Sequence, residues 1–331
     1  MTSTTSPRTD QDEVGWETAP TLIDGARTLQ LTVGQCNLDY WFTAVAQGML
    51  AGLANGHRPG TPVPGYMREP GPLRTALISE LGFRGMAEEK AARAISFLVE
   101  SAPDIPTMEF YATQLIDEAR HARVFRGHIS ELGVSSREMQ NVVRELSGPD
   151  IEAVIEPLER FAQPVRDARD FVGGVVLLTV LVEGVLAPAA ELSERKWRML
   201  DPAAAEIERG AGIDEIRHLT VGSSIIRNHL VAAPQEASRL RSLIDEGMEM
   251  WVKVPMLEVL RKREELFQEG MQQYASVVGD YEIWPGTRLL ETTPGERVEK
   301  ALTWSFEMQQ ERLTYMGLAP LPAADSDGAA D

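Results

Sequence analysis

Two stretches of the chain repeat the pattern Asp-Glu-x-Arg-His. The first runs from Asp117 to His121, and the second, 97 residues later, runs from Asp214 to His218. Each copy contains Glu-x-x-His, and residues three apart on an α-helix share a face about one turn apart. A carboxylate and an imidazole on one face can bind the same metal ion. The repeat therefore predicts a metal site that contains Glu118, His121, Glu215 and His218.

A third carboxylate interrupts an apolar stretch. Residues 171–186 are nearly all apolar, yet they contain Glu183. The stretch is shorter than the about 20 residues of a membrane-spanning helix, so it predicts a buried helix in a bundle core. A lone buried carboxylate is costly and needs a proton or a cation. Glu183 is therefore expected to bind the metal, and pairing with a buried arginine is the alternative.

A fourth contribution follows from the bundle. A four-helix bundle that binds two metals takes one Glu from each of two helices and Glu-x-x-His from each of the other two. Glu183 lies 32 residues before Glu215, and Glu88 and Glu89 lie about as far before Glu118. Glu88 shares a face with apolar residues such as Ile95, whereas Glu89 aligns with Arg93 as a solvent-exposed ion pair. Glu88 is the preferred ligand, and Glu89 remains an alternative ligand.

Neighbouring polar residues are expected to support these ligands. A metal-bound histidine usually donates its other N–H to a carboxylate, which Asp117 and Asp214 can supply to the histidine of the opposite motif. Arg120 and Arg217 would neutralise these aspartates, and Gln114 lies one turn before Glu118. Four carboxylates and two imidazoles suit iron or manganese and leave positions for O₂.

Other candidates are less strongly indicated. By helical spacing His128 shares a face with His121, and His229 shares a face with His218. Both are therefore expected either near the site or in the core. Glu191 is near enough in sequence to be an extra carboxylate, although exposure to solvent is the simpler expectation. His57, in a loop rich in proline and glycine, is expected at the surface.

Helices must position these residues, since no stretch shows convincing strand periodicity. The sequence predicts an all-α protein built on a four-helix bundle, with the metal-binding part at about 86–231 and additional helices around it. Helices are expected at 38–53, 73–81, 86–101, 107–132, 135–146, 151–162, 167–200 (bent at Pro188), 203–231, 237–279 and 296–315. Loops are expected at 57–72 and 284–294.

Length and charge limit the remaining possibilities. The chain has 331 residues and a net charge of −18, which disfavours nucleic acid and anionic membranes as partners. The single cysteine, Cys36, fits a reducing cytoplasm. Segments 1–16 and 321–331 are expected to be disordered, leaving one domain at 17–320. Apolar helices outside the bundle suggest a homodimer.

The repeated motif with its paired upstream glutamates resembles the ferritin-like di-iron carboxylate oxygenases. The run EEKAARAISFLVESAP, followed by EFYATQLIDEARHARVF, is most similar to the small di-iron N-oxygenases of natural-product pathways, which include azoxy-forming proteins. The resemblance covers roughly residues 86–230. One N-oxygenase group has an additional histidine ligand four residues before the second Glu-x-x-His glutamate, where this chain has Ala211.

This resemblance implies a non-haem di-iron monooxygenase that uses O₂. Glu118 and Glu215 would bridge the two irons, with Glu88 and His121 on one and Glu183 with His218 on the other. It also implies a small nitrogen-containing substrate, such as an amine or hydrazine oxidised at nitrogen. Electrons would come from the substrate or from an external ferredoxin or flavin reductase, because the chain shows no flavin, nicotinamide or iron–sulfur motif.

Three other functions stay open. A hydroxylase or desaturase of aliphatic substrates predicts an apolar tunnel, whereas N-oxygenation predicts a few polar anchors. A ferroxidase is disfavoured, because about 85 residues precede the predicted site and about 100 follow it. A non-catalytic helical protein predicts that metal removal changes no function.

Overall fold

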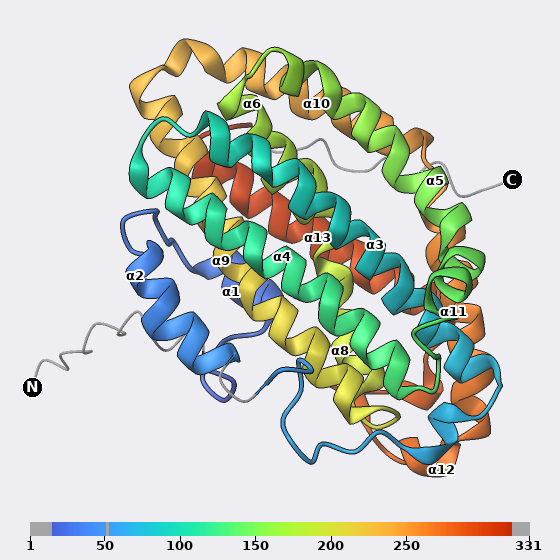
Figure 1. Cartoon of the computed structure of the whole chain (residues 1–331). Helices are drawn as coiled ribbons and strands as arrows, with labels where there is room; N and C mark the ends of the chain where they lie inside the picture. Colours follow the sequence, from blue (N-terminus) through green and yellow to red (C-terminus); the bar gives the residue numbers. More distant parts are fainter. Residues whose placement is uncertain (1–14, 51–52, 320–331) are drawn as a thin grey trace, which may run out of the picture.

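A computed structural model describes residues 15–50 and 53–319 of the chain. The expected disordered segments, 1–16 and 321–331, fall outside these ranges except for Gly15 and Trp16. Trp16 packs partly buried against a small cluster that contains Trp41 and Ile213. The structure is 77% helical and 2% strand, which confirms the predicted all-α class (Figure 1).

Seven long helices make up most of the molecule. They are α3 (Pro72–Ser101), α4 (Ile105–Glu131), α5 (Met139–Asp167), α9 (Pro202–Ala232), α10 (Ala237–Lys253), α11 (Met256–Gln273) and α13 (Pro294–Met316). Short helical pieces are α1 (Leu22–Thr28), α2 (Leu38–Tyr40), η1 (Trp41–Leu50), η2 (Gly65–Arg68), η4 (Pro234–Glu236), α12 (Ala275–Val278) and η5 (Leu289–Glu291). In the described part, the only sheet is a hairpin of β1 (Glu282–Trp284) and β2 (Thr287–Arg288), partly within the loop expected at 284–294.

Helices α3 and α4 form an antiparallel pair at the centre of the molecule (Figure 1). Asp104 begins α4 by accepting the Thr107 N–H at 2.9 Å, a standard N-terminal cap. The sequence predicted two helices, 73–81 and 86–101, where α3 is continuous. Gly82, between the two predicted helices, allows α5 to approach closely, since an added Cβ would lie 2.8 Å from Ser147 Oγ.

Helix α5 also joins two predicted helices, 135–146 and 151–162. It contains Pro149, Pro157 and Pro164, each of which removes one backbone hydrogen bond. Its buried face includes Val143, Ile151, Val154 and Leu158. Packing of this face against the core offsets the lost hydrogen bonds, so the prolines do not end the helix.

The apolar stretch from Phe171 onward is nearly continuous, as expected, but its winding changes along its length. It consists of α6 (Phe171–Val176), the π-helical segment η3 (Leu177–Glu183), α7 (Gly184–Leu186) and α8 (Pro188–Trp197). By length and composition, residues 171–197 could cross a membrane, yet 72% of the most apolar window is buried inside the protein. Such burial is typical of a core helix. The π turn was not predicted, and it ends on Glu183.

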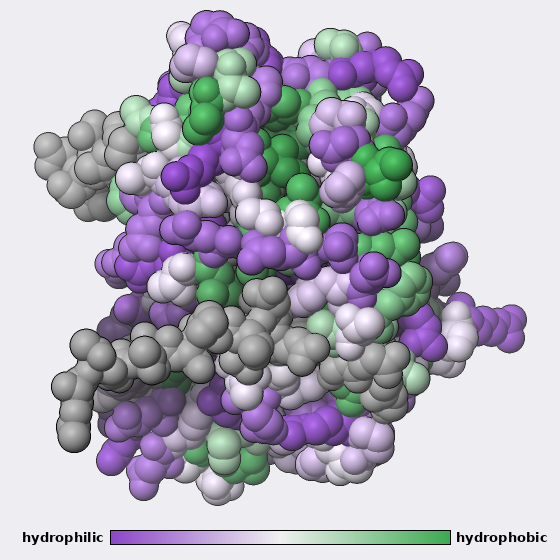
Figure 2. All heavy atoms as spheres, turned by 90° about the vertical axis from the view of Figure 1, so that its left-hand side faces the viewer, coloured by the Kyte–Doolittle hydropathy of each residue, from purple (hydrophilic) through white to green (hydrophobic). Residues whose placement is uncertain are grey.

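The remaining helices cover this core. The helix expected at 237–279 is broken at Pro255 into α10 and α11, because proline cannot donate the backbone hydrogen bond. Helix α11 packs on α3, and α13 packs on α9 and α11. Hydrophilic side chains predominate on the face in Figure 2, with hydrophobic ones grouped mainly in its upper half.

Candidate metal centre

The six residues predicted as metal ligands meet in the interior between four helical stretches. Glu88 comes from α3, Glu118 and His121 from α4, Glu183 from the end of η3, and Glu215 and His218 from α9. Their donor atoms form two groups, in each of which all atoms lie within 4.8 Å of one another. One group is Glu88, Glu118, His121 and Glu215, and the other is Glu118, Glu183 and His218.

Glu118 belongs to both groups and faces both histidines. Its Oε2 lies 3.2 Å from His121 Nδ1, and its Oε1 lies 3.3 Å from His218 Nδ1. His218 Nδ1 is also 3.8 Å from Glu183 Oε1 and 3.9 Å from Glu215 Oε1. Glu118 therefore connects the two donor groups.

Several buried donor atoms of this cluster are unsatisfied. Among the described residues, Glu183 Oε2, Glu215 Oε2 and His218 Nδ1 have no hydrogen-bond partner. A buried polar atom without a partner costs about 1–3 kcal/mol, and such atoms are rare in folded proteins. Divalent cations held by the two donor groups would satisfy these atoms. The donor set therefore fits a metal pair, with oxygen and imidazole donors that suit iron or manganese.

The pKa values of the clustered carboxyl groups also indicate a cation site. Burial, reinforced by nearby carboxylates, raises the pKa of Glu88 and Glu183 well above the usual value, and burial next to Glu118 raises the pKa of Glu215 to about 7. Burial alone would raise the pKa of Glu118, but the adjacent imidazoles of His121 and His218 hold it far below its usual value. Without a cation, several of these carboxyls must therefore keep their protons near neutral pH.

Each motif supplies the carboxylate that orients the histidine of the other. His121 Nε2 donates to Asp214 Oδ2 at 3.1 Å, and His218 Nε2 lies 3.4 Å from Asp117 Oδ2. Burial would lower the pKa of His121, but its bonds to Asp214 and Glu118 raise it to about 10. Both Nδ1 atoms are thereby directed at Glu118.

Two arginines and a tryptophan hold these aspartates. Arg217 donates to Asp117 at 2.6 Å and to Asp214 at 3.0 Å, while Arg120 pairs with Asp214. The Trp41 indole N–H donates to Asp117 Oδ1 at 3.1 Å. Trp41 was not predicted for this site, because a tryptophan in an apolar helix gives no sequence signal for such a contact.

Three further residues lie around Glu88 and Glu183. Gln114 donates its amide N–H to Glu183, in the layer expected from the sequence. Tyr111 and Arg84 were missed. The buried Tyr111 lies near enough to Glu183 for that carboxyl to raise the pKa of its hydroxyl, after the larger effect of burial. Helical spacing could have found both, because Tyr111 lies seven residues before Glu118 and Arg84 lies four before Glu88.

The open candidates lie elsewhere. Glu89 pairs with Arg93 at 2.9 Å on an exposed face, so the geometry selects Glu88. Glu191 is buried, not exposed to solvent as the simpler expectation had it, and it accepts the Ile23 N–H at 2.9 Å and pairs with Arg195. His229 belongs to neither donor group. His57, expected at the surface, is only 9% exposed and lies with His128 in a separate cluster.

A cavity of about 170 Å³ opens on the carboxylate side of the cluster. Glu88, Glu118, Glu183 and Glu215 line it, whereas His121 and His218 do not. Its other walls are mainly apolar and include Phe83, Ala87, Ala91, Leu178, Val182, Leu186, Met256 and Leu260. An engineered cavity of about 150 Å³ binds benzene, so this one has room for a small molecule beside the metal ligands.

The cations that line the cavity are all paired. Lys196 contacts Glu80 at 3.1 Å and also Glu264. Arg263 contacts Asp150 at 2.8 Å, and Arg84 pairs with Glu208. The cavity therefore offers polar groups at its edge but no spare positive charge for an anionic substrate.

No protein-family model matches the sequence.

Proposed function

We propose that this protein is an O₂-dependent non-haem di-iron monooxygenase built on a ferritin-like bundle. The observation that carries the proposal is the buried four-carboxylate, two-histidine cluster, with unsatisfied donor atoms, beside a cavity. A ferroxidase needs no such cavity for an organic molecule. In this proposal Glu88, Glu118, His121 and Glu215 would hold one metal ion, and Glu118, Glu183 and His218 would hold the other.

When bound, the iron pair supplies the reduction of O₂ and the transfer of one oxygen atom. The residues of the chain do the rest. Asp117 and Asp214 fix the histidine rings, and Arg120 and Arg217 neutralise these aspartates. The apolar walls exclude water from the reacting atoms. Because the open side of the cluster faces the cavity, a substrate there lies next to the metal ligands.

We further propose a small nitrogen-containing substrate, an amine or a hydrazine, in a natural-product pathway. The paired cations favour a substrate without a carboxylate, since an acid would find no free positive charge in the cavity. For an amine, R₂NH, O₂, two electrons and two protons give R₂N–OH and water. We propose a ferredoxin or flavin reductase as the electron donor. We also propose that the protein is cytoplasmic and forms a homodimer.

Hydroxylation or desaturation of an aliphatic substrate is the second candidate. The mainly apolar cavity walls favour it, because such a reaction needs no polar anchor. The two functions differ in the product. N-oxygenation retains every C–H bond of the substrate, whereas hydroxylation breaks one such bond and desaturation breaks two.

The first test is metal content with single-turnover chemistry. The metal-free protein is loaded anaerobically with Fe(II), exposed to O₂ and followed by absorbance. We expect about two irons per chain, a new near-ultraviolet band and, with small amines or hydrazines under ¹⁸O₂, one labelled oxygen on nitrogen. Label on carbon, or an unlabelled product with a new C=C bond, would select the second candidate. Less than one bound iron per chain and no reaction with O₂ would refute the oxygenase.

A further inference from the structure

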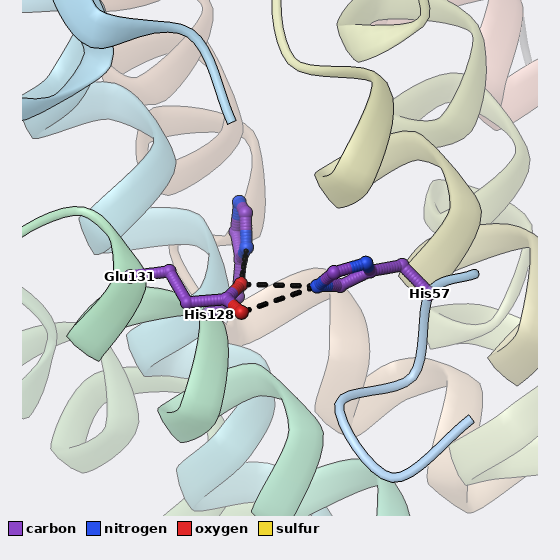
Figure 3. A group of neighbouring side chains, drawn as sticks. All are labelled: His57, His128 and Glu131. Atoms are coloured by element: carbon purple, nitrogen blue, oxygen red, sulfur yellow. Dashed lines mark hydrogen bonds and ion pairs between the residues drawn. The ribbon is translucent and has the colours of Figure 1, made fainter. Parts of the chain in front are cut away.

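A second group of metal-binding side chains lies at the far end of α4. His128 and Glu131 come from the last turns of this helix, and His57 comes from the connection before η2 (Figure 3). His57 Nε2 lies 3.2 Å from both oxygens of Glu131, and His128 Nδ1 lies 2.8 Å from Glu131 Oε2. The three donor atoms lie within 4.8 Å of one another. Both rings therefore point at one carboxylate.

The other nitrogen of each ring is already held. His57 Nδ1 lies 3.1 Å from the carbonyl oxygen of Arg58, and His128 Nε2 lies 3.1 Å from Asp201 Oδ2. Both oxygens only accept hydrogen bonds, so these nitrogens carry the protons. In a neutral ring the lone pair then faces Glu131. A ring whose second N–H is bound by a carboxylate or carbonyl is the usual arrangement of a metal-binding histidine.

This group is more deeply buried than a surface ion pair. His128 and Asp201 are fully buried, and only the side chain of Glu131 is appreciably exposed, at 25%. The amide of Asn55 donates to Glu131 Oε1 at 3.2 Å and fixes the carboxylate from outside. An ion here would be enclosed by protein on one side and open to water on the side of Glu131.

The group is independent of the proposed di-iron centre. It shares no residue with that centre, and His128 follows His121 by seven residues, which is about 10 Å along a helix. Its donor set also differs, with two imidazoles and one carboxylate. This is the ligand set of several mononuclear zinc sites, and it leaves a position for water.

We propose that His57, His128 and Glu131 form a mononuclear site for a divalent transition metal, best matched by Zn²⁺. The ion fastens the connection that carries His57 to the end of α4. Through the hydrogen bond of His128 to Asp201 it also supports the start of α9, where Asp201 accepts the Ala204 N–H at 3.1 Å. The proposal goes beyond the oxygenase function and does not depend on it.

A network of ions without metal is the competing explanation. Two protonated imidazoles beside Glu131 and Asp201 would satisfy the same atoms. The two explanations differ in the response to zinc. A metal site binds zinc tightly near pH 8 and releases protons when it does so, whereas an ion-paired network binds no zinc.

The test is the number of Zn²⁺ ions bound by the chelator-stripped, full-length protein at pH 8. We expect three per chain for the wild type and two for His57→Gln and for His128→Gln. Affinity at the lost site should fall at least 100-fold. His229→Gln is the matched control, since His229 lies outside both groups, and it should bind three. Circular dichroism verifies that each variant stays helical.

The stoichiometry separates this proposal from the oxygenase. If only the dinuclear centre does not bind zinc, the wild type binds one Zn²⁺ and His57→Gln binds none. If only the mononuclear site does not bind zinc, the wild type and His57→Gln both bind two. Equal zinc binding by folded His57→Gln, His128→Gln and wild-type protein overturns the proposal.

Discussion

The imidazole Nε2 of His121 lies 3.1 Å from Oδ2 of Asp214, so the histidine of the first motif is held by the aspartate of the second. The reciprocal pair, His218 and Asp117, is 3.4 Å apart. The two copies of Asp-Glu-x-Arg-His thus complete each other across the contact between α4 and α9. One copy alone would leave the Nε2 atom of its histidine without a carboxylate partner.

Replacing Asp214 by asparagine should weaken metal binding. The amide carries no charge for His121 and Arg120, so the ring loses its fixed orientation, and such changes typically cost 10–100-fold in affinity. Competition with a chromophoric chelator for Mn²⁺ measures the change. Asp245→Asn, at an exposed pair with Arg241, is the control and should bind as the wild type does. Equal affinity of Asp214→Asn and wild type would show that Asp214 does not orient a ligand.

Glu183→Gln should lower iron occupancy and leave a folded helical protein. The site tolerates a neutral amide better than an unpaired buried charge, but it then lacks one anionic donor. Glu89→Gln is the matched control, because Glu89 is exposed and pairs with Arg93. Iron per chain after anaerobic loading should drop only in the first variant. If Glu89→Gln loses iron and Glu88→Gln does not, Glu89 is the ligand.

The metal-free protein should lose stability as the pH rises from 5 to 9. Burial raises the pKa of Glu215 from 4.5 to about 7, so the folded state holds a proton that the unfolded chain has released. The free energy of unfolding therefore falls across this window, by on the order of 3 kcal/mol for Glu215 alone. His121, with a pKa raised to about 10, acts in the same direction, because its contribution is lost as the pH rises toward that value.

Urea unfolding in the presence of a chelator at pH 5, 7 and 9 tests this dependence. Saturating Mn²⁺ should reverse the slope, because the ligands bind metal only when deprotonated. In Glu183→Gln the slope without metal should be shallower, since one raised pKa is removed. Stability of the metal-free wild type that rises with pH would contradict the assignment of these protons.

Helix ends were predictable where local signals agree. The helices expected at 107–132, 203–231 and 296–315 are confirmed within two residues, as α4, α9 and α13. Each begins at a capping residue followed closely by proline, namely Asp104, Asp201 or Thr293. The residues of the candidate site could be named because spacing on a helix fixes which side chains share a face.

The remaining features depend on contacts between distant segments. The π turn before Glu183 has no local signal, and neither does the bond from Trp41 to Asp117. The continuity of α3 through Gly82 depends on such a contact too, because this glycine permits the approach of α5. His57 was expected at the surface because its loop is rich in proline and glycine, and only the fold brings it to Glu131. Helix propensity depends on neighbouring residues, so it cannot predict contacts between residues that are distant in the sequence.

Two glycine-to-alanine changes should have opposite effects on stability. In α11, a Cβ on Gly270 would lie 2.4 Å from the backbone of Leu73, so Gly270→Ala must push α3 and α11 apart. We expect destabilisation of about 1–3 kcal/mol. In α4, a Cβ on Gly127 meets nothing within 4 Å, so Gly127→Ala should stabilise by about 0.5–1 kcal/mol. Urea unfolding measures both, and equal effects would contradict the close packing of α3 on α11.

Filling the cavity should separate substrate binding from metal binding. Ala91 lines the cavity without belonging to the metal cluster, so Ala91→Leu narrows the space beside Glu88 and leaves the ligands in place. We expect about two irons per chain and an unchanged near-ultraviolet band after exposure to O₂. The kcat/KM for the best amine or hydrazine should fall at least tenfold, because the side chain occupies substrate volume. Ala94→Leu, at an exposed position of the same helix, is the control and should keep wild-type kcat/KM. If Ala91→Leu also keeps it, the substrate does not bind in this cavity.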